Sequence, residues 1–236
     1  MIKKQSSISM GTAALITGLT LFVPTSPYGE FYVFGKLIDY DDAAKTTQNL
    51  LQQPQLFLSG IYAMLFTFLK DVLLAWTMYI FVRPVNALLA LLGAWLRIVY
   101  AGLSIVALSN LLTAYQLVHM PALQGAFENE QVLLMVNARR FAMNLAFIVF
   151  GSYLVLGGVL IYKASYISKL MGVLIILAGL AYILISLQPY FFKEYNLSWM
   201  MAFYIGELVF GIWLLVKGSK IKESNIAEYQ RLTTTN

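Results

Sequence analysis

Residues 56–113 read LFLSGIYAMLFTFLKDVLLAWTMYIF, then VRP, then VNALLALLGAWLRIVYAGLSIVALSNLLT, and this stretch decides the fold. Its two apolar arms, 56–81 and 85–113, contain about 26 and about 29 residues, whereas about 20 suffice to cross a bilayer. Only a short turn separates them, in which Pro84 ends one helix and Asn86 suits the start of the next. The stretch therefore predicts two antiparallel membrane-spanning helices that are neighbours.

Three charged side chains interrupt these arms: Lys70, Asp71 and Arg97. At about 1.5 Å per residue, Asp71 lies roughly 15 Å from the turn and Arg97 roughly 18 Å, so both are expected near the bilayer midplane. Adjacent residues of a helix point about 100° apart, so Lys70 and Asp71 cannot both face Arg97. The favoured pairing is Asp71 with Arg97.

The composition is that of an integral membrane protein. Of the 236 residues 60% are hydrophobic and 11% charged, which lies outside globular usage. The net charge of +5 comes from basic residues scattered at predicted helix ends, without the basic stripe and interleaved aromatics of a nucleic-acid interface. We therefore expect a lipid bilayer as partner and no nucleic acid. The absence of cysteine excludes disulfides and thiolate chemistry.

Further apolar runs complete an all-α, polytopic fold with six transmembrane helices. The first, from Ile8 to Val23, has the form of a span or of a signal-peptide core, and we favour a retained helix because no small-residue cleavage pattern follows it. The expected organisation is a single transmembrane domain over residues 1–218 and a polar cytoplasmic tail over 219–236. Its predicted spans are 8–24, 56–81, 85–113, 141–162, 170–187 and 197–216.

Basic residues predict the orientation of these spans. Six crossings place both termini on one side, and the positive-inside rule favours the cytoplasm for that side. The residues then inside are Lys3, Lys4, Arg83, Lys163, Lys169, Lys217, Lys220 and Lys222, and those outside are Lys36, Lys45, Arg139, Arg140 and Lys193.

Two longer connections are expected outside the membrane. Residues 28–54 read as a polar connection, in which Asp41 is expected to cap a short helix that runs to about Gln53. Residues 119–137 form a second external segment, interrupted at Pro121 and Gly125.

A fourth charge, Glu207, lies in the last span, roughly 14 Å from its cytoplasmic end and so in the same layer as the others. Each charge at a helix centre costs at least about 2.5–3.5 kcal/mol on insertion scales. We therefore predict a buried midplane network in which the positive and negative charges compensate each other. Lys70 is expected to pair with Glu207 if the sixth span packs against the second. Tyr100 and Ser104, one and two turns beyond Arg97, are candidates to extend a polar path.

The sequence is compatible with more than one function. In one interpretation the protein has an unknown biochemical role, and the ion pairs of this layer fix the register of the helices. In another, the protein is a small-solute or proton-coupled transporter that uses the same four residues. A third hypothesis is a membrane scaffold or partner-binding subunit. The sequence specifies neither a substrate nor an oligomeric state.

The motifs of several enzyme classes are missing, so the sequence leans against an enzyme and gives no catalytic residues. The single histidine, His119, falls in a predicted loop, which leaves no paired-histidine metal site and no base for Ser59. No phosphate-binding glycine loop occurs, and Gly157-Gly158 lies in an apolar helix as an expected packing site. We predict no metal and no cofactor.

Short motifs recur in a fixed order along nearly the whole chain. They are DAA at 42–44, KDVLLA at 70–75, RPVN at 83–86, LR at 96–97, FG at 150–151, KASY at 163–166, LMGVL at 170–174, AGLAY at 178–182, GEL at 206–208, WLL at 213–215 and KG at 217–218. Together these motifs resemble a bacterial membrane family known as domain of unknown function 4386, with one departure at Ser168, where family members often have proline. The resemblance implies a multi-pass helical protein of the bacterial cytoplasmic (inner) membrane, and it implies no activity.

Overall fold

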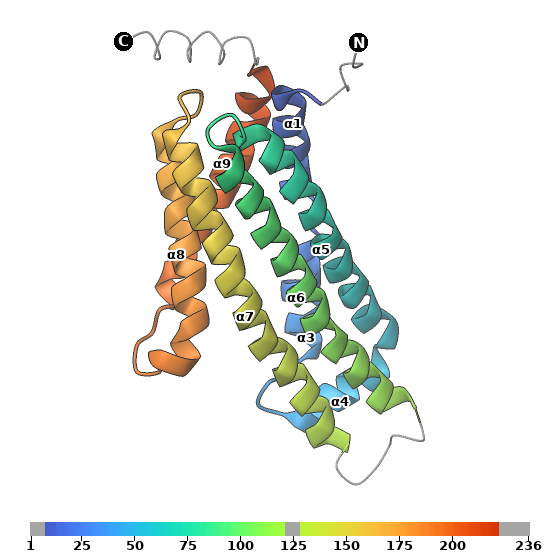
Figure 1. Ribbon diagram of the computed structural model, residues 1–236. Helices are drawn as coiled ribbons and strands as arrows, with labels where there is room; N and C mark the ends of the chain where they lie inside the picture. Colours follow the sequence, from blue (N-terminus) through green and yellow to red (C-terminus); the bar gives the residue numbers. More distant parts are fainter. Residues whose placement is uncertain (1–7, 121–127, 222–236) are drawn as a thin grey trace, which may run out of the picture. The chain divides into compact units, whose positions relative to one another are not determined.

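The computed structural model describes residues 8–120 and 128–221 and is helical over nearly all of them, without a strand in these ranges (Figure 1). The predicted all-α class is confirmed. The chain forms two compact units, each built from separate parts of the sequence. Unit 1 contains residues 1–23, 73–97 and 150–236, and unit 2 contains residues 24–72 and 98–149.

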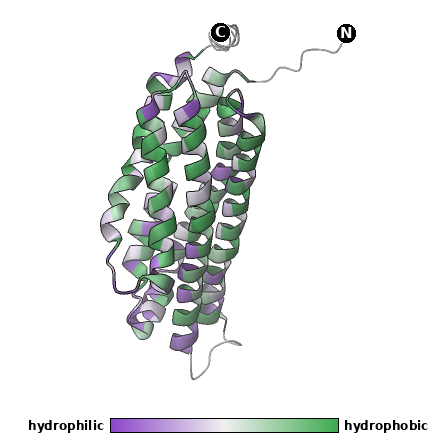
Figure 2. Ribbon diagram, turned by 60° about the vertical axis from the view of Figure 1, so that its left-hand side comes forward, coloured by the Kyte–Doolittle hydropathy of each residue, from purple (hydrophilic) through white to green (hydrophobic). Residues whose placement is uncertain are grey.

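Within the described ranges, five helical segments are long and apolar enough to cross a membrane. Figure 2 shows hydrophobic residues along most of their length. They are α5 (Pro54–Val82), α6 (Ala87–His119), α7 (Glu128–Lys163), α8 (Lys169–Phe191) and the segment Ser198–Lys220, which comprises η3 (Ser198–Tyr204), α9 (Ile205–Val216) and η4 (Gly218–Lys220).

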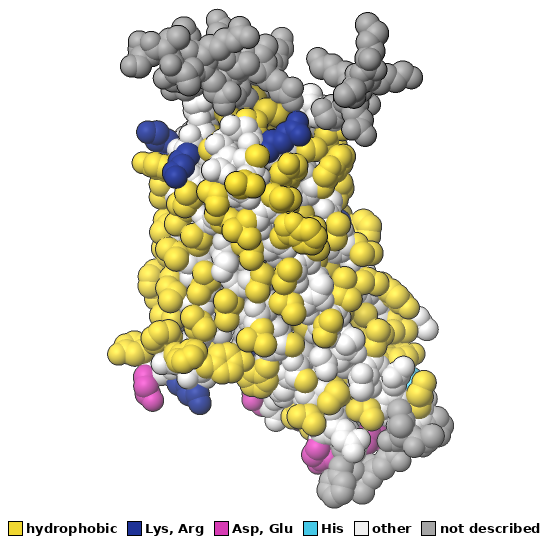
Figure 3. Space-filling model, in the orientation of Figure 1, with side chains coloured by type: hydrophobic (Ala, Val, Ile, Leu, Met, Phe, Trp, Pro, Cys, Tyr) yellow, Lys and Arg dark blue, Asp and Glu magenta, His cyan; other side chains and the backbone are white. Residues whose placement is uncertain are grey.

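The apolar side chains of these helices face outward as well as inward. Only 28% to 44% of the most apolar window of each segment is buried. In Figure 3 hydrophobic side chains cover most of the visible surface, and the visible charged side chains lie near helix ends. Soluble monomers rarely expose contiguous apolar patches above a few hundred Å², so this surface supports a membrane protein.

The first predicted span is shorter than expected. α1 (Met10–Leu21) has 12 residues, and it begins where the Ser9 hydroxyl accepts a hydrogen bond from the Thr12 amide. Such a helix is about 18 Å long, less than the roughly 30 Å hydrocarbon core. The described residues therefore establish five candidate spans, and the sixth stays a prediction.

The expectation of a polar connection over residues 28–54 is wrong for its first part. Helical turns follow one another there, and Val33, Phe34 and Leu37 are buried. A Cβ added to Gly60 of α5 would lie 2.6 Å from the Val33 side chain, so this glycine permits the close approach. The elements are α2 (Thr25–Pro27), the π-helix η1 (Tyr28–Phe34), α3 (Gly35–Leu37) and α4 (Ala43–Gln52).

The cap of α4 is Asp42 rather than Asp41. Asp42 has extended backbone angles, and its carboxylate accepts a hydrogen bond of 2.9 Å from the Lys45 amide. Asp41 precedes the helix by one residue too many to reach the first-turn amides. At the turn between α5 and α6 the expectation is confirmed, because Asn86 Oδ1 accepts from the Leu89 amide at 3.0 Å.

α7 is longer than the fourth predicted span, 141–162, whose bounds stay a prediction. The helix begins at Glu128, because Val132 and Val136 bury an apolar face and Glu128 lies at the positive end of the helix. The expectation that Pro189 ends the fifth helix is wrong, because α8 continues past it to Phe191. The predicted interruption at Pro121 and Gly125 and the predicted tail beyond residue 221 lie outside the described residues.

Glycines bring α7 and α8 into backbone contact within unit 1. A Cβ added to Gly151 would lie 2.5 Å from the Gly179 carbonyl oxygen, and one added to Gly158 would lie 2.7 Å from Ile176. The packing role expected of Gly158 is confirmed. Gly157 differs, since a Cβ added there would meet nothing within 4 Å.

Candidate functional site

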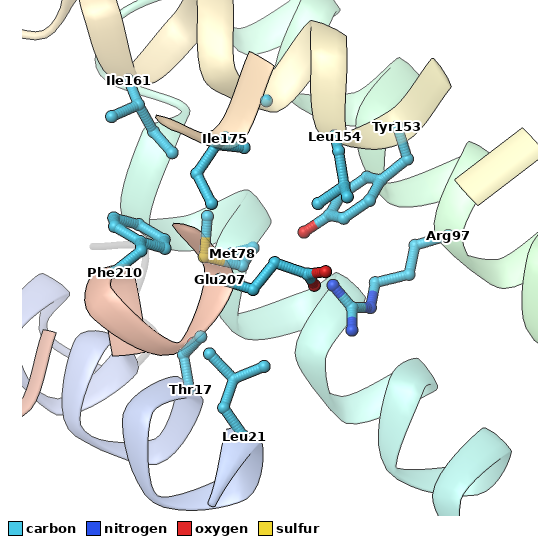
Figure 4. A pocket seen from close by; sticks show the side chains of 11 residues that line it. Thr17, Leu21, Met78, Arg97, Tyr153, Leu154, Ile161, Ile175, Glu207 and Phe210 are labelled. Atoms are coloured by element: carbon cyan, nitrogen blue, oxygen red, sulfur yellow. The ribbon is translucent and has the colours of Figure 1, made fainter. Parts of the chain in front are cut away.

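A small polar cavity lies among the helices of unit 1. Its volume is about 30 Å³, and its polar lining comes from Thr17 of α1, Arg97 of α6, Tyr153 of α7 and Glu207 of α9 (Figure 4). The remaining lining is almost entirely aliphatic and aromatic. A cavity of this size holds a water molecule, because one water needs roughly 10–15 Å³ measured in the same way.

Arg97 is the most deeply buried charge of this cavity, with 5% of its surface exposed. Its guanidinium lies 4.8 Å from the ring centroid of Tyr153 and 5.4 Å from that of Phe150. Cation–π attraction of this kind contributes about 0.5–2 kcal/mol, which is less than the cost of burying a cation without an anion. Figure 4 shows the Glu207 carboxylate pointing toward the guanidinium.

Close helix packing positions Glu207. A Cβ added to the preceding Gly206 would lie 2.8 Å from the Leu174 carbonyl oxygen, so α9 can approach α8 only with glycine there. On α1, a Cβ at Gly18 would lie 2.7 Å from the Leu215 side chain of α9. α9 is thus fixed against both helices, which sets the depth and direction of the half-buried Glu207 side chain.

A buried hydroxyl pair adjoins the cavity. Thr17 Oγ1 lies 2.7 Å from Thr77 Oγ1 and 2.9 Å from the Ala13 carbonyl oxygen. Both threonines are buried, with 1% and 0% exposure. Thr17 and Tyr153 line the cavity but were not predicted from the sequence. Helical periodicity places Tyr153 on one face of its helix, together with residues 150, 154, 157 and 161. The sequence does not indicate which other helices pack against this face and complete the cavity.

The predicted site residues divide between the two units. Arg97 and Glu207 come together in unit 1, whereas Lys70 and Asp71 belong to unit 2. Asp71 is buried, with 5% exposure, and Lys70 is half-buried. The pairings of Asp71 with Arg97 and of Lys70 with Glu207 stay predictions.

Tyr100 and Ser104, the predicted polar path, are buried in unit 2. The Tyr100 ring stacks on Phe147 with centroids 6.3 Å apart and meets Phe68 edge-on at 6.2 Å. Ser104 Oγ has no hydrogen-bond partner among residues 8–120 and 128–221. Their polar-path role stays a prediction.

An ion pair of unit 2, between Arg139 and Glu30, was not predicted from the sequence. Arg139 Nη1 donates to Glu30 Oε1 at 2.9 Å, and Nη2 donates to Glu30 Oε2. Arg139 is only 3% exposed, and its guanidinium lies 5.1 Å from the Phe34 ring centroid. From the sequence it was interpreted as an outer topology charge, because its partner lies 109 residues away.

Among residues 8–120 and 128–221, no three His, Asp or Glu side chains are grouped so as to hold a metal ion. His119 instead stacks on Tyr115 at the end of α6, with ring centroids 4.2 Å apart.

Comparison with known proteins supports the resemblance read from the motifs. The family described as Domain of unknown function (DUF4386) matches residues 11–218. The chain belongs to this family. An uncharacterized protein of Archaeoglobus fulgidus is 32% identical over 155 residues, which cover 65% of this chain and 80% of the relative. No solved structure matches the chain. Since this DUF4386 protein resembles an archaeal one, a bacterial source stays a prediction.

Proposed function

We propose that this DUF4386 protein is a proton-coupled membrane protein whose functional centre is the cavity between Arg97 and Glu207. One observation carries the proposal: an ionisable carboxylate and a buried guanidinium share a water-sized space inside a bundle of apolar helices. Ionisable groups within membrane-spanning segments are costly and are usually kept for function.

The volume of the cavity favours a proton over an organic solute. Pockets for small molecules occupy about 300–1,000 Å³, roughly ten times the space between Arg97 and Glu207. A solute carrier would need a second conformation with a larger cavity. A proton needs only a titratable group and a water molecule to reach it.

Glu207 is the group that takes up the proton, because an arginine guanidinium stays protonated in proteins. Neutralising Glu207 removes a negative charge from the space that it shares with the buried Arg97 guanidinium, which changes the electrostatic environment of that cation. We infer that proton uptake by Glu207 is coupled to a rearrangement of the side chains around Arg97. The sequence predicts that Asp71 pairs with Arg97, which would give the guanidinium a carboxylate besides Glu207.

For the setting, we propose six crossings of a cytoplasmic membrane with both termini in the cytoplasm. The bias of basic residues toward one set of predicted helix ends supports this orientation. The motifs shared with a bacterial membrane family support the choice of membrane.

Proton flux into proteoliposomes tests the proposal. With an internal pH-sensitive dye and an imposed potassium diffusion potential, the wild-type protein should acidify the lumen. Glu207→Gln should lower the rate at least tenfold, which corresponds to about 1.4 kcal/mol. Glu194→Gln removes an exposed carboxylate of unit 1 and should leave the rate unchanged. Equal rates in all three proteins, or none above protein-free vesicles, would leave the Arg97–Glu207 pair with a structural role.

A further inference from the structure

Unit 2 contains a second, larger cavity with a different chemistry. Its volume is about 280 Å³, and it lies between α7 and the segment that carries Glu30 and Tyr40. From α7 it is lined by Arg139, Arg140, Asn144 and Phe147. The function proposed for Arg97 and Glu207 makes no use of these residues.

The charges of this cavity sum to a positive value. Both oxygens of the Glu30 carboxylate accept from Arg139, so these two charges compensate each other. Arg140 adds a further cation, which is exposed and lies 5.0 Å from the Tyr40 ring centroid. An anion is therefore the favoured occupant.

Several hydrogen-bond donors line the same space. The Arg140 guanidinium, the Asn144 amide and the Tyr40 hydroxyl can each donate. The buried Arg139 has an Nε–H group without a partner among the described residues. A buried donor without an acceptor costs about 1–3 kcal/mol, so this guanidinium keeps hydrogen-bonding capacity that Glu30 does not use.

The position of Arg140 along α7 points to the source of the anion. The apolar run of α7 follows it directly and extends to about residue 162, roughly 33 Å, which matches the hydrocarbon core of a bilayer. The cavity then lies at the level of the lipid headgroups, and Phe147 offers an apolar wall on the membrane side.

We propose that this cavity binds a phosphate-bearing anion, held by Arg140, Asn144 and the Tyr40 hydroxyl beside the Arg139–Glu30 pair. Guanidinium groups match the geometry of phosphate oxygens, and the volume suits a group no larger than a lipid headgroup. The same chemistry would accept the headgroup of an anionic phospholipid or a soluble phosphate.

Thermal unfolding in neutral detergent tests this site. Phosphatidylglycerol, phosphatidylcholine and sodium phosphate are titrated separately at constant ionic strength. At least one of the two phosphate anions should raise the melting temperature saturably, and phosphatidylcholine should not. A response to phosphatidylglycerol alone identifies a lipid site, and an equal response to sodium phosphate identifies a free-anion site. No rise with either anion would overturn the proposal.

Variants separate the site from general charge effects. Arg140→Gln should raise the half-saturating concentration about tenfold, because one charge-assisted contact is lost. Lys36→Gln removes an exposed charge of the same unit outside the cavity and should leave it unchanged. Asn144→Ala should also weaken binding, although it alters no charge. If all three variants respond as the wild type does, the anion binds elsewhere and the assignment is wrong.

Discussion

At the scale of single residues, Arg97 and Glu207 depend on each other unequally. Arg97 is 5% exposed and cannot lose its charge, whereas the Glu207 side chain is half-buried. Removing the carboxylate therefore leaves the more costly group behind. The asymmetry gives a specific expectation for stability.

A double-mutant cycle measures this dependence. Glu207→Gln should lower the free energy of unfolding by about 3 kcal/mol, because the buried guanidinium loses the carboxylate charge that points toward it (Figure 4). Arg97→Gln should cost less, and the double variant should cost less than the sum of the two by about 1 kcal/mol or more. The free energies come from unfolding in mixed micelles, and strictly additive losses would show that the two side chains do not interact.

At the scale of elements, the start of α4 distinguishes two adjacent aspartates. Asp42→Ala should lower the free energy of unfolding by about 1 kcal/mol, since the Lys45 amide loses its acceptor. Asp41→Ala removes the same charge one residue earlier and should cost only a few tenths of that. The comparison uses thermal or denaturant unfolding of both variants, and equal losses would contradict Asp42 as the cap.

Two glycines of α7 make a second matched pair. Gly151→Ala should destabilise the protein by about 1–3 kcal/mol, because the new methyl group would meet the Gly179 carbonyl oxygen at 2.5 Å and force α7 from α8. Gly157→Ala meets no atom within 4 Å and should be neutral or stabilising by up to about 1 kcal/mol through helix propensity. A neutral Gly151→Ala would show that the two backbones are not in contact.

The sequence predicts the long helices well and the contacts between them poorly. A bilayer demands about 20 apolar residues for a helical span, so α5, α6 and α8 are readable from hydropathy alone. The π-helical turns at 28–34 and the pairing of Glu30 with Arg139 depend on partners distant in the sequence. For the candidate site, depth along the chain indicated Arg97 and Glu207, but Thr17 and Tyr153 follow only from the packing of α1 and α7.

At the scale of the whole molecule, the number of crossings decides which side each terminus faces. α1 is too short to span alone, so a crossing by this segment needs residues outside Met10–Leu21. Six crossings place reporters fused to the two termini on the same side, and five place them on opposite sides. We expect both reporters in the cytoplasm. Reporters on opposite sides of the membrane would show that the first predicted span does not cross it.

We propose that protons reach Glu207 through the cavity that it shares with Arg97. A side chain that fills this cavity tests the proposal without removing a charge. Gly157→Val places a side chain into a lining position that is free of neighbours within 4 Å. Gly102→Val makes the same change at an open position of unit 2. The measurement is proton flux into proteoliposomes, with equal folded protein per vesicle. We expect Gly157→Val to lower the flux about tenfold or more and Gly102→Val to retain it. Wild-type flux through Gly157→Val would contradict the proposal.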